Sequence, residues 1–234
     1  MATQKKTNEQ LNVEEVVVQS EAFFIKNQKA IIMGMIAIVA IVTGYFAYKH
    51  LYAIPREEKA QIALFKGEQY FENGAYELAL NGDSIGYIGF LKVIEQYGGT
   101  NVANLARAYA GICYKQLEEY EKAIEYLSGF SGNDQMVAPS ILGAIGNAYA
   151  ELDQLDKASS FLIRAADKAD NNALSPLFLK QAGDIFIKQE KYDDAVKVYT
   201  KIKEKYFQSR QASDIDKYIE RAKMMKVKQE IERS

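Results

Sequence analysis

The chain has 234 residues, of which 48% are hydrophobic and 26% charged, and its formal net charge is −2. These proportions exclude a chain dominated by disorder, and the near balance of charge gives no basic field that would favour nucleic-acid binding. Prolines are few, and the short alternating strands and frequent turn clusters of a sandwich or barrel are missing, so we predict an all-α fold.

Residues 1–29 form a leader with two parts. A polar start is followed by a mixed stretch of apolar and charged residues from position 13 to 28. This stretch could lie as an amphipathic helix along a membrane surface, or it could extend the apolar helix that follows it.

Residues 30–48 are the first strong signal in the chain. These 19 consecutive residues carry no charge, and as a helix they would reach about 28 Å, roughly the hydrocarbon thickness of a bilayer. A signal peptide would have a shorter leader, and a buried core helix seldom stays apolar on every face over this length. We therefore predict one transmembrane helix over residues 30–48.

The orientation of this span follows less directly from charge. The nearby cations on its two sides are Lys26 and Lys29 before it and Lys49, Arg56 and Lys59 after it. This near tie does not prevent translocation, because long domains cross a membrane largely regardless of their charge. We expect a cytoplasmic leader, a short linker over residues 49–57, and a C-terminal domain in the periplasm.

Residues 58–207 contain four copies of one pattern. The copies align on Gly67, Gly111, Gly146 and Gly183. Three residues after each glycine stand Tyr70, Tyr114, Tyr149 and Phe186. Twelve residues after each glycine stand Ala79, Ala123, Ala158 and Ala195, and these are preceded at three residues by Tyr76, Tyr120, Leu155 and Tyr192.

This spacing predicts helical hairpins. Glycine would allow a close neighbour on the first helix, and alanine would let the second helix pack back after a short polar turn. Pro139 and Pro176 each stand seven residues before a glycine, which suits the first turn of a helix. One isolated hairpin could not bury its apolar stripes, so we expect neighbouring hairpins to stack.

The pattern resembles the tetratricopeptide repeat family over about 150 of the 234 residues. It departs from that family in two ways: the chain has no tryptophan, and the usual closing proline is absent. The glycine intervals are 44, 35 and 37 residues, so the first copy carries an insertion of about ten residues centred on residues 81–89. This insertion is either a binding loop or a tolerated surface insertion.

The resemblance implies a superhelical solenoid whose concave face is lined by the first helix of each hairpin. By register, the positions facing the groove are Glu68, Phe71, Ile112, Lys115, Asn147, Glu151, Lys180, Asp184 and Lys188. Their mixed charge and few apolar side chains suit peptide segments or helices of other proteins.

The end of the chain, residues 208–234, is predicted to be a capping helix. Ile215, Tyr218, Ile219 and Ala222 share one face, and the Lys/Glu-rich side would supply the polar outer surface that a terminal repeat needs.

Residues able to support catalysis are sparse. The only histidine, His50, follows the span, and the only cysteine, Cys113, lies inside a repeat. No phosphate-binding, dinucleotide-binding or zinc-ligand spacing occurs in the sequence. We therefore predict no enzyme activity, cofactor, metal or small-molecule substrate.

A spanning helix followed by such repeats resembles the ancillary subunit of the bacterial Sec translocon, which implies a chaperone-like partner of secretion machinery in the inner membrane. The same architecture would serve a scaffold of another envelope assembly, such as cell division, outer-membrane assembly or secretion, or a docking subunit of an enzyme complex.

Overall fold

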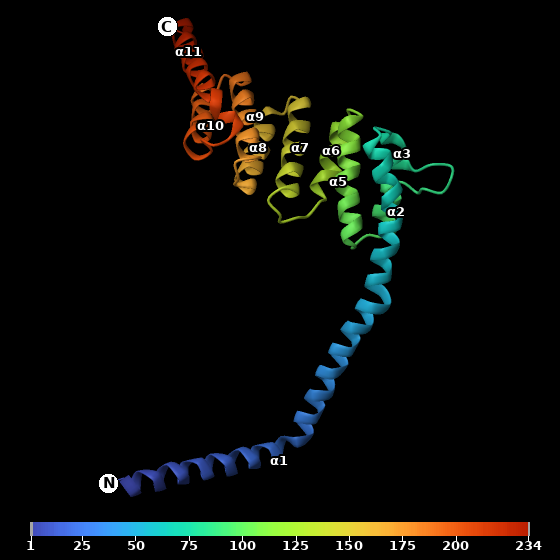
Figure 1. Ribbon diagram of the computed structural model, residues 1–234, viewed down its shortest axis with the longest axis vertical. Helices are drawn as coiled ribbons and strands as arrows, with labels where there is room; N and C mark the ends of the chain where they lie inside the picture. The colour runs from blue at the N-terminus through green and yellow to red at the C-terminus, as the bar shows by residue number, and fades with distance from the viewer. Residues whose placement is uncertain (1, 234) are drawn as a thin grey trace. The chain divides into compact units, whose positions relative to one another are not determined.

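The computed structural model describes residues 2–233, and the side chains of residues 21, 23 and 25–233. Within residues 2–233 every regular element is helical and no strand occurs (Figure 1). The predicted all-α class is therefore confirmed. The chain divides into two compact units, Met1–Pro55 and Arg56–Ser234, and each is described by itself.

The first unit consists mainly of α1, Ala2–Tyr48. A helical stretch that begins at Ile25 is long and apolar enough to cross a membrane, and none of the residues in its most apolar window is buried. A soluble core helix of this length would be covered by other elements. The leader belongs to the same helix, but most of the side chains in its mixed stretch, residues 13–28, lie outside the described ones.

Residues 49–57 are helical as well. A π-helical turn, Lys49–Ala53, precedes α2, Ile54–Glu72, in which Pro55 is the second residue. Pro55 cannot donate a hydrogen bond, and its ring crowds the carbonyl four residues earlier. The Ile54 N–H donates to the carbonyl of Lys49, five residues back, so the helix widens just before the proline.

The second unit contains paired helices in chain order. The first members of the pairs are α2, α5 (Asn101–Gln116), α7 (Val137–Glu151) and α9 (Ser175–Lys188). The second members are α3 (Tyr76–Asn81) with α4 (Phe90–Gln96), α6 (Tyr120–Ser128), α8 (Leu155–Ala169) and α10 (Tyr192–Lys205). From α4 to α10 each helix packs against the next one along the chain (Figure 1).

The same tight turn joins the two members of every pair. Its first position has a positive φ, between 56° and 74°, in Gly74, Glu118, Asp153 and Glu190. The next residue has φ between −82° and −88° and ψ between 62° and 67°. Its N–H donates over 2.8–2.9 Å to the carbonyl of the recurring aromatic residue, which is Tyr70, Tyr114, Tyr149 or Phe186. The second helices therefore begin at equivalent residues of the four copies, Tyr76, Tyr120, Leu155 and Tyr192.

Small residues stand where the paired helices approach most closely. A Cβ added at Gly111 would lie 2.5 Å from Cγ of Leu127, and one added at Gly183 would lie 2.5 Å from Cζ of Tyr199. Such distances are shorter than van der Waals contact, so only glycine fits there. The four recurring alanines are all 0% exposed. Pro139 and Pro176 lie in the first turns of α7 and α9, as predicted.

The insertion in the first copy splits a helix. Residues 82–89 separate α3 from α4, and Phe90 at the start of α4 packs against Gly67. Asp83 organises this loop, since its carboxylate accepts bonds from the Tyr70 hydroxyl at 2.7 Å and from backbone N–H groups, and pairs with Lys66 at 2.8 Å. The Lys66 ammonium holds the pKa of Asp83 well below its usual range.

Two adjacent side chains of α2 contact the ends of the helices that follow. Arg56 donates to the carbonyl of Gln96, the last residue of α4, at 2.7 Å, and to that of Gly98 at 3.3 Å. The Glu57 carboxylate accepts from the backbone N–H groups of Asn101 and Val102, which open α5. The positive charge of Arg56 thus lies at the C-terminal end of α4, where the helix dipole is negative, and the negative charge of Glu57 lies at the N-terminal end of α5, where the dipole is positive.

The chain closes with a 3-10 turn, Arg210–Asp214, and α11, Ile215–Arg233. Ile215, Ile219 and Ala222 are buried, and α11 packs against α10. Met224, Val227 and Ile231, in the second half of α11, are 70%, 53% and 69% exposed.

Candidate functional site

The nine predicted groove residues all lie on the first helices of the pairs. Glu68 and Phe71 are on α2, Ile112 and Lys115 on α5, Asn147 and Glu151 on α7, and Lys180, Asp184 and Lys188 on α9. Glu151, Asp184 and Lys188 are exposed, and the other six are half-buried.

Several of these side chains already have partners within the chain. Phe71 packs edge-on against Tyr109 at a centroid distance of 5.0 Å, and Ile112 packs against the core around Leu127. Lys180 and Asp184 form an ion pair at 3.0 Å. Contacts of this kind stabilise the second unit and reduce what these residues can offer to a ligand.

The cysteine and the histidine considered for catalysis each pack against neighbouring side chains. Cys113 is fully buried, and burial raises the pKa of its thiol to about 12, so it is not a reactive thiolate at neutral pH. His50 lies in the π-helical turn and stacks on the ring of Phe46. Among the described residues no group of three or more His, Cys, Asp or Glu side chains could hold a metal ion.

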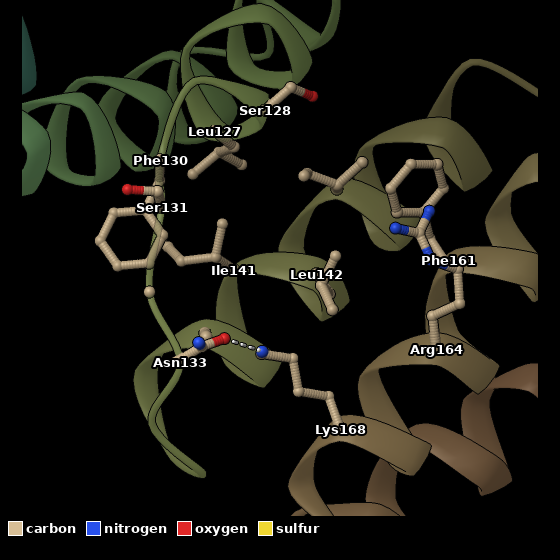
Figure 2. A pocket seen from close by; sticks show the side chains of 13 residues that line it. Leu127, Ser128, Phe130, Ser131, Asn133, Ile141, Leu142, Phe161, Arg164 and Lys168 are labelled. Atoms are coloured by element: carbon tan, nitrogen blue, oxygen red, sulfur yellow. Dashed lines mark hydrogen bonds between the residues drawn. The ribbon is translucent and has the colours of Figure 1, made fainter.

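A groove on the second unit lies at the end of α6. It has a volume of about 710 Å³ and lies between the end of α6, the segment that follows it, α7 and α8 (Figure 2). Its apolar lining is formed by Leu127, Phe130, Ala138, Ile141, Leu142, Ile145 and Phe161. Its polar lining includes Ser128, Ser131, Asn133, Arg164 and Lys168. We call it the α6–α8 groove.

The groove exists because α6 is short. This helix ends at Ser128 after 9 residues, whereas α8 has 15 residues and α10 has 14, so each of these continues for about one and a half further turns. Residues 129–136 form an irregular segment in its place, with Phe130 half-buried against the groove. The face of α7 that a longer α6 would cover is therefore open.

Hydrogen bonds anchor the irregular segment. Asn104 exchanges two bonds with the backbone of Ser131, at 2.7 and 2.9 Å. The Asp134 carboxylate accepts from N–H groups at the start of α7, and these bonds hold the pKa of Asp134 below its usual value. The Lys168 ammonium donates to Asn133 at 3.0 Å. The groove wall is thus a defined structure.

Two cations stand at the mouth of the groove. The Arg164 guanidinium lies over the ring of Phe161, 4.6 Å from its centroid, and Lys168 reaches across to Asn133 (Figure 2). Within the described part of the chain neither cation is ion-paired with a carboxylate, whereas many other lysines of this unit are.

None of the groove residues was among the predicted site residues. The sequence contains a signal for this groove, because the stretch from Gly129 to Asp134 is a cluster of turn-forming residues where the third and fourth copies continue a helix. That cluster shows where α6 ends, but it cannot show what faces the gap.

Comparison with known proteins adds no assignment. No family model matches the chain, and no curated protein matches it.

Proposed function

We propose that this protein is a membrane-tethered scaffold of the tetratricopeptide repeat type, which binds other proteins through a solenoid of stacked helical hairpins. The observation that carries the proposal is the fourfold recurrence of one hairpin, with the same turn bond in every copy, on a chain that also has a long uncovered apolar helix. Stacked repeats of this kind present extended surfaces for protein ligands.

The surface of the second unit supports a binding role. It carries mixed charges on the first helices and an apolar groove of about 710 Å³ rimmed by two cations. Concave apolar sites with a few polar groups at their rim are common ligand-binding features. A protein ligand fits them better than nucleic acid does, because the chain is slightly acidic.

The proposed location is the inner membrane of a bacterial cell envelope, with α1 spanning the bilayer and the repeats in the periplasm. Protease treatment of intact and of opened cells tests the orientation. Digestion of the repeat domain once only the outer membrane has been opened supports it, and protection until the inner membrane is broken contradicts it.

We further propose a chaperone-like role beside the protein translocation machinery, as the architecture of a single anchor followed by repeats suggests. Cross-linking in intact cells, followed by purification of the full chain in mild detergent, tests this role. Recovery of translocon subunits or periplasmic folding factors supports it. Recovery of cell-division or outer-membrane assembly proteins in their place supports a scaffold of another envelope assembly.

A further inference from the structure

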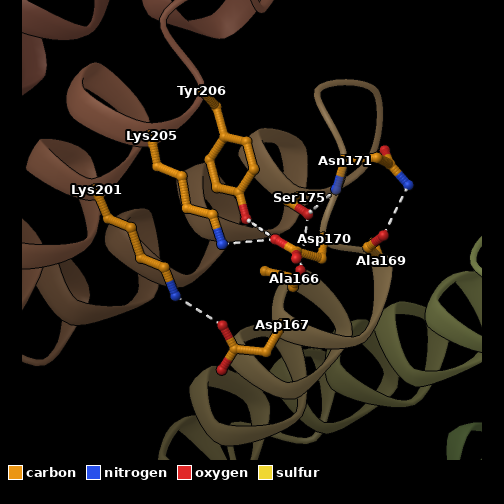
Figure 3. A network of polar contacts seen from close by, with 9 residues as sticks. All are labelled: Ala166, Asp167, Ala169, Asp170, Asn171, Ser175, Lys201, Lys205 and Tyr206. Atoms are coloured by element: carbon orange, nitrogen blue, oxygen red, sulfur yellow. Dashed lines mark hydrogen bonds and ion pairs between the residues drawn. The ribbon is translucent and has the colours of Figure 1, made fainter.

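The interface between α8 and α10 shows how two consecutive second helices are linked. Asp167 of α8 pairs with Lys201 of α10 at 2.7 Å, and Asp170 pairs with Lys205 at 2.6 Å (Figure 3). The Tyr206 hydroxyl donates to the same Asp170 carboxylate at 3.2 Å. In this interface the earlier helix supplies the carboxylates and the later helix the ammonium groups.

The preceding interface has the cations but lacks the carboxylates. Lys201 and Lys205 stand 18 and 22 residues after Gly183, and Arg164 and Lys168 stand at the same distances after Gly146. Their acidic partners would belong to a continued α6, but that helix ends at Ser128. The equivalents of Asp167 and Asp170 in the second copy are Gly132 and Gln135, so no carboxylate replaces them.

The one carboxylate in that segment is already used. Asp134 accepts hydrogen bonds from the first N–H groups of α7, and Lys168 bonds to the neutral side chain of Asn133. Arg164 meets only the ring of Phe161 among the described contacts. Both cations therefore keep unneutralised charge at the groove mouth.

The apolar parts of the two interfaces differ in the same way. On α9, Leu179 is 0% exposed because it packs in one cluster with Leu162, Ala165 and Ala166 of α8. Its equivalent on α7, Leu142, is half-buried and lines the groove. A second groove of about 560 Å³ runs between α8 and α10, but its lysines Lys201 and Lys205 are ion-paired.

We propose that the α6–α8 groove binds a helical segment of another protein that replaces the missing turns of α6, with small apolar side chains toward α7 and two carboxylates, three residues apart, toward Arg164 and Lys168. This inference rests on the proposed scaffold function and names the chemistry of its ligand. The chain itself supplies the template, because the end of α8 is a helix of this kind and occupies the corresponding place one repeat later.

A peptide with the sequence of residues 155–171, which covers α8 and its C-cap, is the probe. Its binding to the full chain in detergent micelles is measured by fluorescence anisotropy with a labelled peptide. A control peptide carries Asp167→Asn and Asp170→Asn. We expect saturable binding of the first peptide and at least about fivefold weaker binding of the control, because two ion pairs are lost. The difference should shrink as salt is raised.

Variants of the full chain test whether the peptide binds in the α6–α8 groove. Arg164→Gln with Lys168→Gln should weaken binding of the acidic peptide and abolish the preference between the two peptides. Asn133→Asp should also weaken binding, because it gives Lys168 an internal carboxylate. Lys157→Gln, on the same helix but outside the groove, is the matched control and should leave binding unchanged. Far-UV circular dichroism confirms that each variant is folded.

Equal binding of the two peptides overturns the proposal, as does a preference that survives Arg164→Gln with Lys168→Gln. Self-association of the chain that this double variant abolishes also overturns it, since the occupant is then a second copy. If cells yield cross-linked partners but the peptide does not bind, the scaffold function stands and the groove proposal falls.

Discussion

The turn that joins each helical pair offers a sharp test of the repeat, because one copy serves as a control for the others. Its first residue has a positive φ in all four copies: it is glycine at position 74 and an acidic residue at positions 118, 153 and 190. Glu118 is the clearest target, since its side chain is exposed, while Asp153 pairs with Lys188 and Glu190 accepts from Gln229. We predict that Glu118→Gly stabilises the protein.

The magnitude follows from two opposing effects on the backbone. A left-handed conformation costs an ordinary L-residue about 1–2 kcal/mol, and glycine does not have this cost. Glycine loses more conformational freedom on folding, about 0.5–1 kcal/mol. The net gain in the free energy of unfolding should be about 0.5–1 kcal/mol, or roughly 1–4 °C in midpoint temperature for a unit of this size.

Thermal unfolding of the full chain in detergent, followed by circular dichroism of the helical signal, measures the effect. Glu118→Ala removes the same charge but keeps the Cβ, so it should change the midpoint little. Gly74→Ala introduces the same left-handed backbone strain into the first copy, which lacks it, and should lower the midpoint temperature by a similar amount. A midpoint that Glu118→Gly lowers, or that Glu118→Ala raises equally, would refute the reasoning.

Three further predictions concern the core, the inserted loop and the buried thiol. Gly183→Ala should destabilise the protein by about 1–3 kcal/mol in chemical denaturation, because the added methyl overlaps the buried Tyr199 ring; an unchanged midpoint would show that the ring can move. Asp83→Asn should lower stability at neutral pH and have less effect in acid: the folded-state pKa of Asp83 is depressed, so its contribution is present above the unfolded-state pKa and disappears as the pH falls. An equal loss of stability at every pH would count against the ion pair between Asp83 and Lys66. Cys113 should react with a thiol reagent at pH 8 only after denaturation, since burial raises the pKa of its thiol to about 12; rapid labelling of the folded chain would contradict this.

The local structure of this protein can be predicted from its sequence because local physics decides it. The uncharged run of 19 residues lies in α1, as its length predicts, and the first turns of α7 and α9 tolerate their prolines. Recurring glycine, aromatic and alanine positions predict where each pair turns, since the aromatic carbonyl accepts the turn bond and the small residues lie at the crossing. The all-α class and the place of the turn between the aromatic residue and the alanine of each copy follow from this pattern.

Only the tertiary structure decided which surface is open. The length of α6 determines whether α7 is covered. Where a helix ends in a turn-rich segment depends on competing hydrogen bonds. Here these bonds come from Asn104 and Asp134, which lie on different elements. Likewise, Arg164 and Lys201 occupy equivalent positions in the repeat, yet only Lys201 finds a carboxylate, because its partner is contributed by a neighbouring helix about 34 residues away in sequence. Ion pairing and burial depend on contacts between distant residues, and a local pattern does not contain that information.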